Sequence, residues 1–235
     1  MNLLKEKREN FNDIDDLDDL KAEYDKLQLE YGAKELDSIY HGGCMNHPDI
    51  CFVFMNPTGR NIASNKSWKG LKSPWIGTKN IWDLFVALEL LDPKIYDRIK
   101  SMKGNEWTEE FAELVYDDVR RHKYFITNLG KCTQVDARPL PDSVYLQYLH
   151  LLEKEIEIVN PKVIVLFGNQ VSSIVLGQKI SVSQCRKQRF SKNINGREYE
   201  CYSVFYPVGN GRFNMGKSIE DIRWILQNMP HSKGL

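Results

Sequence analysis

The 235-residue sequence has no long hydrophobic run and no excess of either sign of charge. No stretch reaches the roughly 18–20 apolar residues of a membrane-spanning helix, and the first residues, MNLLKEKRENF, lack the core of a signal peptide. Lysine plus arginine equals aspartate plus glutamate at 32 each, which excludes the global basic field of many nucleic-acid-binding proteins. We expect a cytoplasmic monomer without membrane contact, associated with the nucleoid if the source is bacterial.

The sequence also lacks the motifs of several other protein classes. Its five cysteines form no CxxC pair, and its five histidines show no metal-ligand spacing. It contains no GxSxG nucleophile elbow and no GxGxxG dinucleotide motif after a strand. These absences argue against a zinc site, a disulfide framework and a generic α/β hydrolase or nucleotide-binding protein. We interpret Cys51 and Cys201 as small buried side chains because each opens an apolar run.

The charges that are present are unevenly distributed. Residues 11–30 hold eight acidic side chains and two lysines, whereas residues 59–80 hold five basic side chains and no acid. A neutral chain can therefore present one strongly positive face. Apolar and aromatic residues near the start recur at helical spacing and predict an amphipathic helix that ends near Gly32: Ile14, Leu17, Leu20, Tyr24, Leu27 and Tyr31. The simplest interpretation of the acidic side of this helix is a solvated face. Alternatives are that the helix packs as a cap, recruits a partner or mimics the charge of DNA.

Four short apolar runs bounded by turn or helix signals predict buried strands over residues 50–55, 124–127, 163–167 and 202–205. Helical patterns cover residues 80–91, 108–121, 142–159 and 170–176. This alternation predicts a three-layer α/β/α fold around a central four-stranded, mostly parallel sheet. We expect residues 1–40 to form a helical extension packed on a single domain of residues 41–235.

Polar segments rich in Gly, Pro and Asn follow all four predicted strands. They are residues 56–60 (NPTGR), 128–132 (NLGKC), 168–170 (GNQ) and 206–212 (YPVGNGR). One such segment is usually only a turn. Ligands of parallel α/β sheets bind beyond the carboxyl ends of the strands. Because all four predicted strands are followed by such a segment, we expect a ligand site at that edge of the sheet.

The ordered set of motifs resembles the uracil-DNA glycosylase superfamily. FITNLGKCTQVDARPLPDS resembles the TNVVKCRPPxNRxPTPEE segment of family-4 enzymes, and EIEIVNPKVIVLFGNQV is similar to their EIELLKPKVIVALGATA. SPWIGTKNIWDLF occupies the place of their RPFVGRAGQLLDRLL. The resemblance covers about residues 51–211. It implies a DNA-repair glycosylase that flips uracil, or a related deaminated base, out of DNA and hydrolyses its N-glycosidic bond with an Asn-positioned water.

Two motifs depart from the family-4 pattern, and most of its cluster cysteines have no counterpart. Residues 55–59 (MNPTG) are closer to the GMNPG of the single-strand-selective and mismatch-specific classes, and Tyr206 replaces the histidine of an HPS motif. Family 4 holds an iron–sulfur cluster through four cysteines. Cys132 matches the third, but Gln147 falls at the place of the fourth and no N-terminal CxxC exists. We therefore expect no cofactor and no metal.

The resemblance implies two catalytic side chains and a base-binding set. Asn56 would aim the water, and Tyr206 would donate a neutral hydrogen bond to the departing base. Asn128 carries one acceptor and two donors, which match N3–H and O4 of uracil and reject cytosine by about 1–3 kcal/mol. Trp75 stands where the family stacks a Phe on the base. The expected substrate-binding residues are Asn128, Trp75, Met55, Pro57 and Gly77. From the residues alone, a turn-forming Asn56, a strand-capping Asn128 and a core Trp75 remain alternatives.

We expect basic side chains at the loop ends to bind the DNA backbone, with solvated surface charges as the alternative. The set is Arg60, Lys66, Lys69, Lys131, Arg138 and Arg212, with Lys72, Arg186, Lys187 and Arg189 as further members. Arg212 or Phe213 would also fill the vacated base stack. A second functional hypothesis is a glycosylase-fold protein that binds DNA or a base with weak or no catalysis because the motif histidine is Tyr206. The preferred lesion and strandedness stay open.

Overall fold

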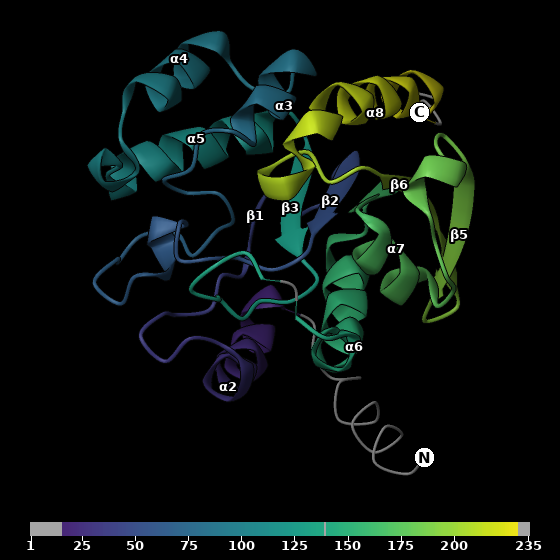
Figure 1. The fold of residues 1–235 in the computed structure, drawn as a ribbon, viewed down its shortest axis with the longest axis horizontal. Helices are drawn as coiled ribbons and strands as arrows, with labels where there is room; N and C mark the ends of the chain where they lie inside the picture. The colour runs from purple at the N-terminus through teal and green to yellow at the C-terminus, as the bar shows by residue number, and fades with distance from the viewer. Residues whose placement is uncertain (1–15, 139, 230–235) are drawn as a thin grey trace.

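The structure is a computed structural model that describes residues 16–138 and 140–229 (Figure 1). Its centre is a six-stranded sheet in the order β1-β3-β2-β4-β6-β5. The four inner strands are parallel and correspond to the predicted runs: β2 (Ile50–Phe54), β3 (Tyr124–Asn128), β4 (Val163–Phe167) and β6 (Arg197–Val204). The mostly parallel α/β fold is confirmed, but the prediction of four strands is wrong, because an antiparallel strand is added at each edge.

The two edge strands differ from the inner ones in composition. β2, β3 and β4 are buried at every position, as expected of strands covered on both faces. β5 (Arg189–Ile194) alternates exposed and partly buried residues, and β1 (His41–Gly43) is only three residues long. Gly42 leaves no room for a side chain, since an added Cβ would lie 2.2 Å from the Tyr116 ring. A very short edge strand, such as β1, and a polar one, such as β5, both resist pairing with other chains.

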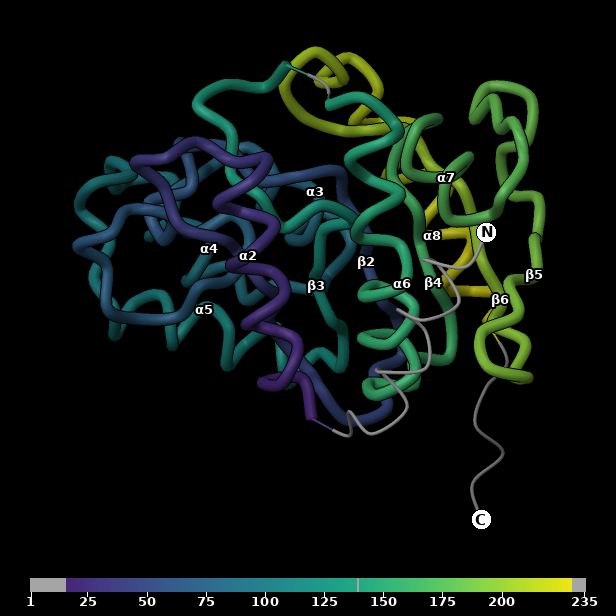
Figure 2. Tube along the Cα trace, turned by 90° about the horizontal axis from the view of Figure 1, so that it is seen from below, coloured from purple at the N-terminus to yellow at the C-terminus, as the bar shows by residue number. Residues whose placement is uncertain are grey.

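Helices cover both faces of the sheet (Figures 1 and 2). One face packs against α3 (Trp82–Ala87), α4 (Pro93–Ser101), α5 (Glu109–Arg121) and α8 (Met215–Asn228). The other packs against α2 (Lys21–Tyr31), α6 (Asp142–Val159) and α7 (Asn169–Leu176). Short 3-10 turns cover Leu17–Leu20, Ile62–Ser64, Gly104–Glu106, Val182–Gln184 and Gly209–Asn214. The three-layer prediction is confirmed.

The helix predicted over residues 80–91 is shorter than expected. It ends at Ala87, and Glu89 adopts a left-handed φ of 60°. A new helix, α4, starts at Pro93, and the Asp92 side chain caps it by accepting from the backbone N–H of Lys94. Neither α4 nor α8 was predicted. The helices predicted over 108–121, 142–159 and 170–176 agree with α5, α6 and α7 to within one residue.

The N-terminal segment packs on the α6 face of the domain. Tyr24 and Leu27 of α2 are buried in the same apolar cluster as Tyr148 of α6. The Gln28 side chain accepts from the backbone N–H of Thr133 at 2.7 Å. The helix ends at Tyr31 with Gly32 as its C-cap, in agreement with the predicted end near Gly32, while Ile14 of the predicted pattern lies outside the described residues. Cys51 and Cys201 are fully buried, as predicted.

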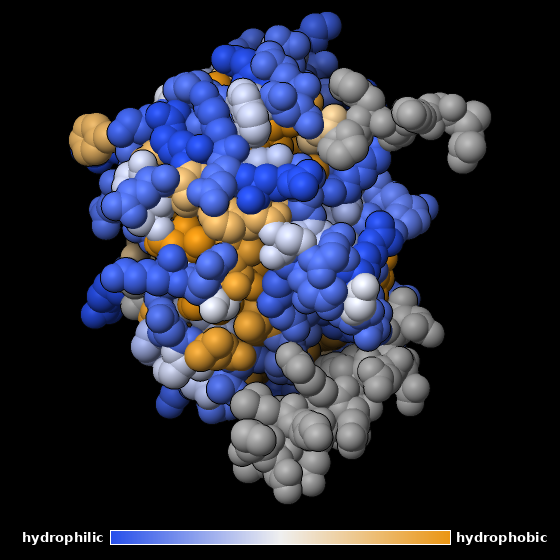
Figure 3. Space-filling model, turned by 90° about the vertical axis from the view of Figure 1, so that its right-hand side faces the viewer, coloured by the Kyte–Doolittle hydropathy of each residue, from blue (hydrophilic) through white to orange (hydrophobic). Residues whose placement is uncertain are grey.

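A third, small apolar cluster lies near α7 and the β5–β6 hairpin. It contains Ile180, Val182 and Cys185, with Leu176, Phe190 and Phe205 packed against it. Figure 3 faces the side of the molecule that carries these elements and shows apolar surface among charged side chains. None of the described helices is both long and apolar enough to cross a membrane.

Candidate active site

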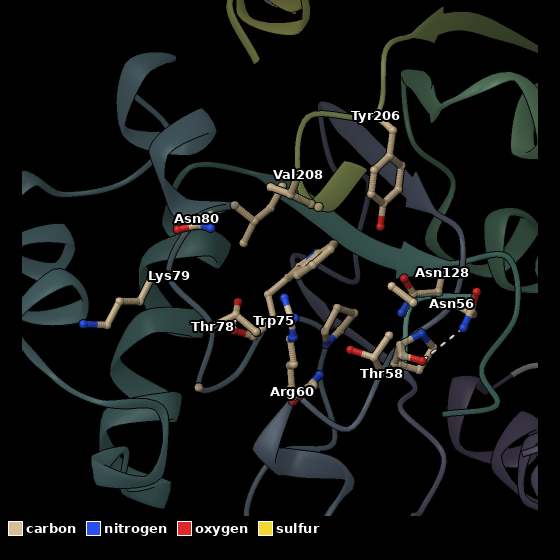
Figure 4. A pocket seen from close by; sticks show the side chains of 17 residues that line it. Asn56, Thr58, Arg60, Trp75, Thr78, Lys79, Asn80, Asn128, Tyr206 and Val208 are labelled. Atoms are coloured by element: carbon tan, nitrogen blue, oxygen red, sulfur yellow. Dashed lines mark hydrogen bonds between the residues drawn. The ribbon is translucent and has the colours of Figure 1, made fainter. Parts of the chain in front are cut away.

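A cavity of about 480 Å³ opens beyond the carboxyl ends of β2, β3 and β6 (Figure 4). Asn56 follows β2, Asn128 ends β3 and Tyr206 follows β6, and all three line the cavity with Trp75. β2 and β3 are parallel neighbours in register, with Phe54 opposite Asn128, so both strands end at the same edge. Pro57 and Gly77, two further residues of the expected site, also line the cavity.

Asn128 presents an unpaired donor at the cavity wall. The residue is only 2% exposed, and its Nδ2 has no hydrogen-bond partner among the described residues. Leaving a buried donor unpaired costs about 1–3 kcal/mol, which a ligand acceptor would recover. The backbone oxygen of Asn128 accepts a hydrogen bond from Lys131 Nζ at 2.9 Å, which fixes the end of the strand.

The Asn56 side chain is held at both ends of its amide. Its Nδ2 donates to the backbone oxygen of Pro57 at 3.1 Å, and its Oδ1 accepts from the Tyr145 hydroxyl at 2.6 Å. The Pro57 oxygen also accepts from the backbone N–H of Gln134 at 3.1 Å. Sequence analysis missed Tyr145, whose helical spacing on α6 indicates only that it faces the core.

Trp75 stands in a constrained loop before α3. Its φ of 70° is rare for a residue other than glycine, and such outliers persist where the surroundings enforce them. The backbone N–H and hydroxyl of Thr78 donate to the Trp75 carbonyl at 3.1 and 2.7 Å, and the Tyr116 hydroxyl donates to the Pro74 carbonyl. The indole meets the Phe54 ring edge-on at 5.0 Å. The loop therefore supplies a fixed aromatic wall.

Tyr206 reaches the cavity from the loop after β6. Its ring packs edge-on against Phe54 with centroids 6.2 Å apart, and Figure 4 shows its hydroxyl pointing toward the side of the cavity occupied by Asn128. Burial raises the pKa of Tyr206 above its ordinary value, so the hydroxyl is a neutral donor at pH 7. Gly211 is required by the turn that follows, because an added Cβ would lie 2.0 Å from the Tyr206 carbonyl oxygen.

The cavity has a positive lining. Arg60 and Lys79 line it, although Lys79 Nζ donates to the Lys100 carbonyl at 2.7 Å and points away from Trp75 and Asn128 in Figure 4, and no acidic side chain occurs among the described residues of its wall. An uncompensated positive lining attracts anionic ligands such as a phosphate backbone. The wall also includes polar and apolar residues that sequence analysis did not single out as site residues: Thr58, Asn61, Thr78, Asn80, Ile81 and Val208.

Two loops flank the cavity mouth. Ala137 and Gly209 line the cavity, and each belongs to a loop that carries an exposed arginine, Arg138 and Arg212 respectively. Arg138 pairs with Asp136 at 2.9 Å, and the Arg212 guanidinium lies 4.7 Å from the ring centroid of Phe213, which is 82% exposed. Figure 2 shows both loops on the same side of the molecule.

The remaining expected DNA-binding residues are less uniform in position. Lys66 and Lys69 are exposed, but Lys66 lines a second cavity beside α2 rather than the first. Four further basic residues are paired with acids: Lys72 with Asp37, Arg186 with Glu220 and Asp221, Lys187 with Glu220, and Arg189 with Glu200. These ion pairs reduce the positive charge that the four basic residues would offer to DNA.

Two expected site residues require correction. The Lys131 side chain is 1% exposed, and its Nζ lies 2.8 and 3.1 Å from the Glu155 carboxylate oxygens, so it cannot contact DNA. Burial lowers the pKa of Lys131 and raises that of Glu155, and each partner opposes the shift of the other. Met55 packs against the apolar cluster on the α6 face and does not line the cavity. Adjacent side chains of an extended chain point to opposite faces. Phe54 packs in the apolar cluster on the opposite face of the sheet from Met55.

Residues 211–218 (GRFNMGKS) match the GxxxxGK[ST] phosphate-loop pattern, which sequence analysis overlooked. In the structure this segment does not form a phosphate loop. Gly209–Asn214 is a 3-10 turn, and Ser218 is fully buried with its hydroxyl donating to the carbonyls of Phe205 and Asn214. The hydroxyl that would bind a nucleotide-bound metal is therefore committed to the fold.

The metal-ligating side chains present in this chain do not fit the four-cysteine iron–sulfur cluster of family 4. Cys132 is buried, and its sulfur accepts from Gln134 Nε2 at 3.8 Å. Within residues 16–138 and 140–229, no group of three or more His, Cys, Asp or Glu side chains could hold a metal ion.

The fold and the cavity define an α/β protein with a cavity lined by strand-terminal amides and aromatic rings. The sequence model of the uracil DNA glycosylase superfamily matches residues 42–228, which is most of the chain. The protein therefore belongs to the uracil-DNA glycosylase superfamily, and it is a glycosylase-fold protein.

Proposed function

We propose that the protein is a monofunctional DNA glycosylase that hydrolyses the N-glycosidic bond of uracil, or of a related deaminated base, in DNA. The observation that carries the proposal is the unpaired donor of Asn128 in a cavity that Asn56, Trp75 and Tyr206 also line. Membership of the superfamily and the acid-free lining of the described wall support DNA as the substrate class.

The base would be recognised by one amide and one aromatic ring. A flipped uracil stacks on Trp75 while Asn128 donates from Nδ2 to O4 and accepts the N3–H with Oδ1. Stacking contributes about 1–3 kcal/mol per base, which offsets much of the few kcal/mol needed to extrude it. Cytosine presents an amino group in place of O4 and would leave the Asn128 donor unpaired.

Bond cleavage would then depend on Tyr206 and Asn56. The electron pair of the glycosidic bond moves to N1 of uracil, and negative charge develops on O2 while the sugar becomes oxocarbenium-like. The neutral Tyr206 hydroxyl donates to O2, and Asn56 orients the water that attacks C1′ of the sugar. The proton that this water loses neutralises the uracil anion, so the products are an abasic site and free uracil. Preorganised dipoles of this kind are usually the largest single contribution to catalysis.

Single-turnover release of uracil from a DNA oligonucleotide in EDTA tests the proposal. We expect release by the wild-type protein and a rate on the order of 100- to 1000-fold lower for Asn56→Ala, with unchanged DNA affinity by fluorescence anisotropy. Asn105→Ala, an exposed asparagine outside the cavity, is the matched control and should behave as wild type. Intact substrate at high excess of wild-type protein would refute the proposal.

A second function is favoured by one specific observation, the tyrosine at position 206 in place of the family histidine. A tyrosine hydroxyl lies farther from its backbone than an imidazole nitrogen, so the protein would bind DNA or a base with little or no turnover. Tight DNA binding without cleavage, together with turnover that appears in Tyr206→His, would support this function over the first.

A further inference from the structure

We propose that Tyr145 is a positioning residue that acts on the reaction through Asn56; this inference rests on the proposed glycosylase function. The Tyr145 hydroxyl donates to Asn56 Oδ1 at 2.6 Å from the first turns of α6. Tyr145 is fully buried and does not line the cavity, so it contacts Asn56 and not the substrate.

The hydrogen bonds around Asn56 select one orientation of its amide. An amide turned by 180° would bring Oδ1 against the Pro57 carbonyl oxygen, where two acceptors repel. In the observed orientation Nδ2 donates to that oxygen at 3.1 Å and Oδ1 receives the Tyr145 hydroxyl. An amide oxygen has two lone pairs, so one remains to accept a water. Tyr145 therefore determines the direction in which that lone pair points.

The position of Tyr145 is itself fixed by close packing against the ends of two strands. An added Cβ at Gly130 would lie 3.1 Å from the Tyr145 ring and 3.5 Å from Asn56 Cβ, so only glycine fits between them easily. The backbone N–H of Gly130 donates to the Met55 carbonyl at 2.8 Å, which joins the ends of β3 and β2. Burial raises the pKa of Tyr145, so its hydroxyl stays a neutral donor at assay pH.

Tyr145→Phe removes the hydroxyl and keeps the packed ring. We expect the single-turnover rate of uracil release to fall roughly tenfold, the effect of losing one hydrogen bond, with DNA affinity unchanged. Tyr124→Phe is the matched control, because the buried Tyr124 hydroxyl on β3 has no hydrogen-bond partner within the described chain. That variant should retain the wild-type rate.

A double-mutant cycle separates positioning from a general structural role. If Tyr145 acts through Asn56, Tyr145→Phe should not lower the residual rate of Asn56→Ala any further. An equal loss in both backgrounds would overturn the positioning role.

A second readout does not depend on catalysis. In Asn56→Asp the Tyr145 hydroxyl would donate to the introduced carboxylate and lower its pKa, so adding Tyr145→Phe should raise that pKa by about one unit, followed by NMR titration. Equal pKa values in the two variants would refute the contact. No uracil release by wild-type protein would instead refute the proposed function, so the two failures are distinguishable.

Discussion

Replacing Asn128 by aspartate changes one donor into an acceptor at nearly constant shape. In the wild-type protein Nδ2 is buried and unpaired, ready to donate to an acceptor in the cavity. A carboxylate oxygen at that position would face O4 of uracil without a hydrogen between them. Cytosine presents an amino group at the same position and would gain a partner instead.

The expected size of the effect follows from the buried donor. An unpaired buried donor costs about 1–3 kcal/mol, so losing its pairing with uracil lowers the rate by about 5- to 150-fold. Repulsion between the carboxylate and O4 places the effect near the upper end. We therefore expect a loss of roughly 100-fold for uracil.

Single-stranded oligonucleotides with one uracil or one cytosine are the best substrates, since no base pair must be broken. Enzyme in excess, followed by alkaline cleavage of the abasic site, gives the single-turnover rate for each base. Asn105→Asp makes the same chemical change at an exposed position and should have no effect. Wild-type uracil rates and an unchanged ratio of uracil to cytosine release in Asn128→Asp would contradict the role of Asn128.

Two further predictions concern Tyr206 and the buried ion pair. Tyr206→Phe should lower the single-turnover rate by about 100- to 1000-fold with DNA affinity unchanged. Because burial raises the pKa of Tyr206, the protonated, donating form persists to higher pH than in a free tyrosine. Ionisation of Tyr206 should therefore cost no activity up to about pH 10. A fall in the pH–rate profile with a midpoint below about pH 10 that disappears in Tyr206→Phe would contradict this expectation. Lys131→Met leaves Glu155 buried without its cation and should lower the free energy of unfolding in urea by about 3–5 kcal/mol, whereas Lys131→Met/Glu155→Leu should recover most of it. Equal losses in the single and double variants would be the contrary result.

The inner sheet could be predicted from the sequence because strands buried on both faces consist of short apolar runs. The edge strands carry a weaker signal. β5 (RFSKNI) is mostly polar and has only two apolar residues, Phe190 and Ile194, and β1 consists of His41, Gly42 and Gly43. The Asn195–Gly196 pair that turns the β5–β6 hairpin, with φ values of 48° and 84°, is a signal that sequence analysis did not use.

Helix boundaries depended on local signals of unequal strength. Asp92 and Pro93 form a typical helix start, but the apolar residues before them extended the predicted helix across the break after Ala87. Where an apolar stripe ended at clear turn residues, as at Gly177 after α7, the prediction agreed with the structure.

The sequence by itself determined that Asn56, Asn128 and Tyr206 would meet, because each follows or ends a parallel strand and the carboxyl ends of such strands share one edge of a sheet. Only the tertiary structure decided which neighbouring side chains turn inward. Lys131 meets Glu155 across 24 positions of sequence, and Tyr145 meets Asn56 across 89. Side-chain direction in a loop depends on the burial and charge of distant segments, and local sequence patterns contain neither.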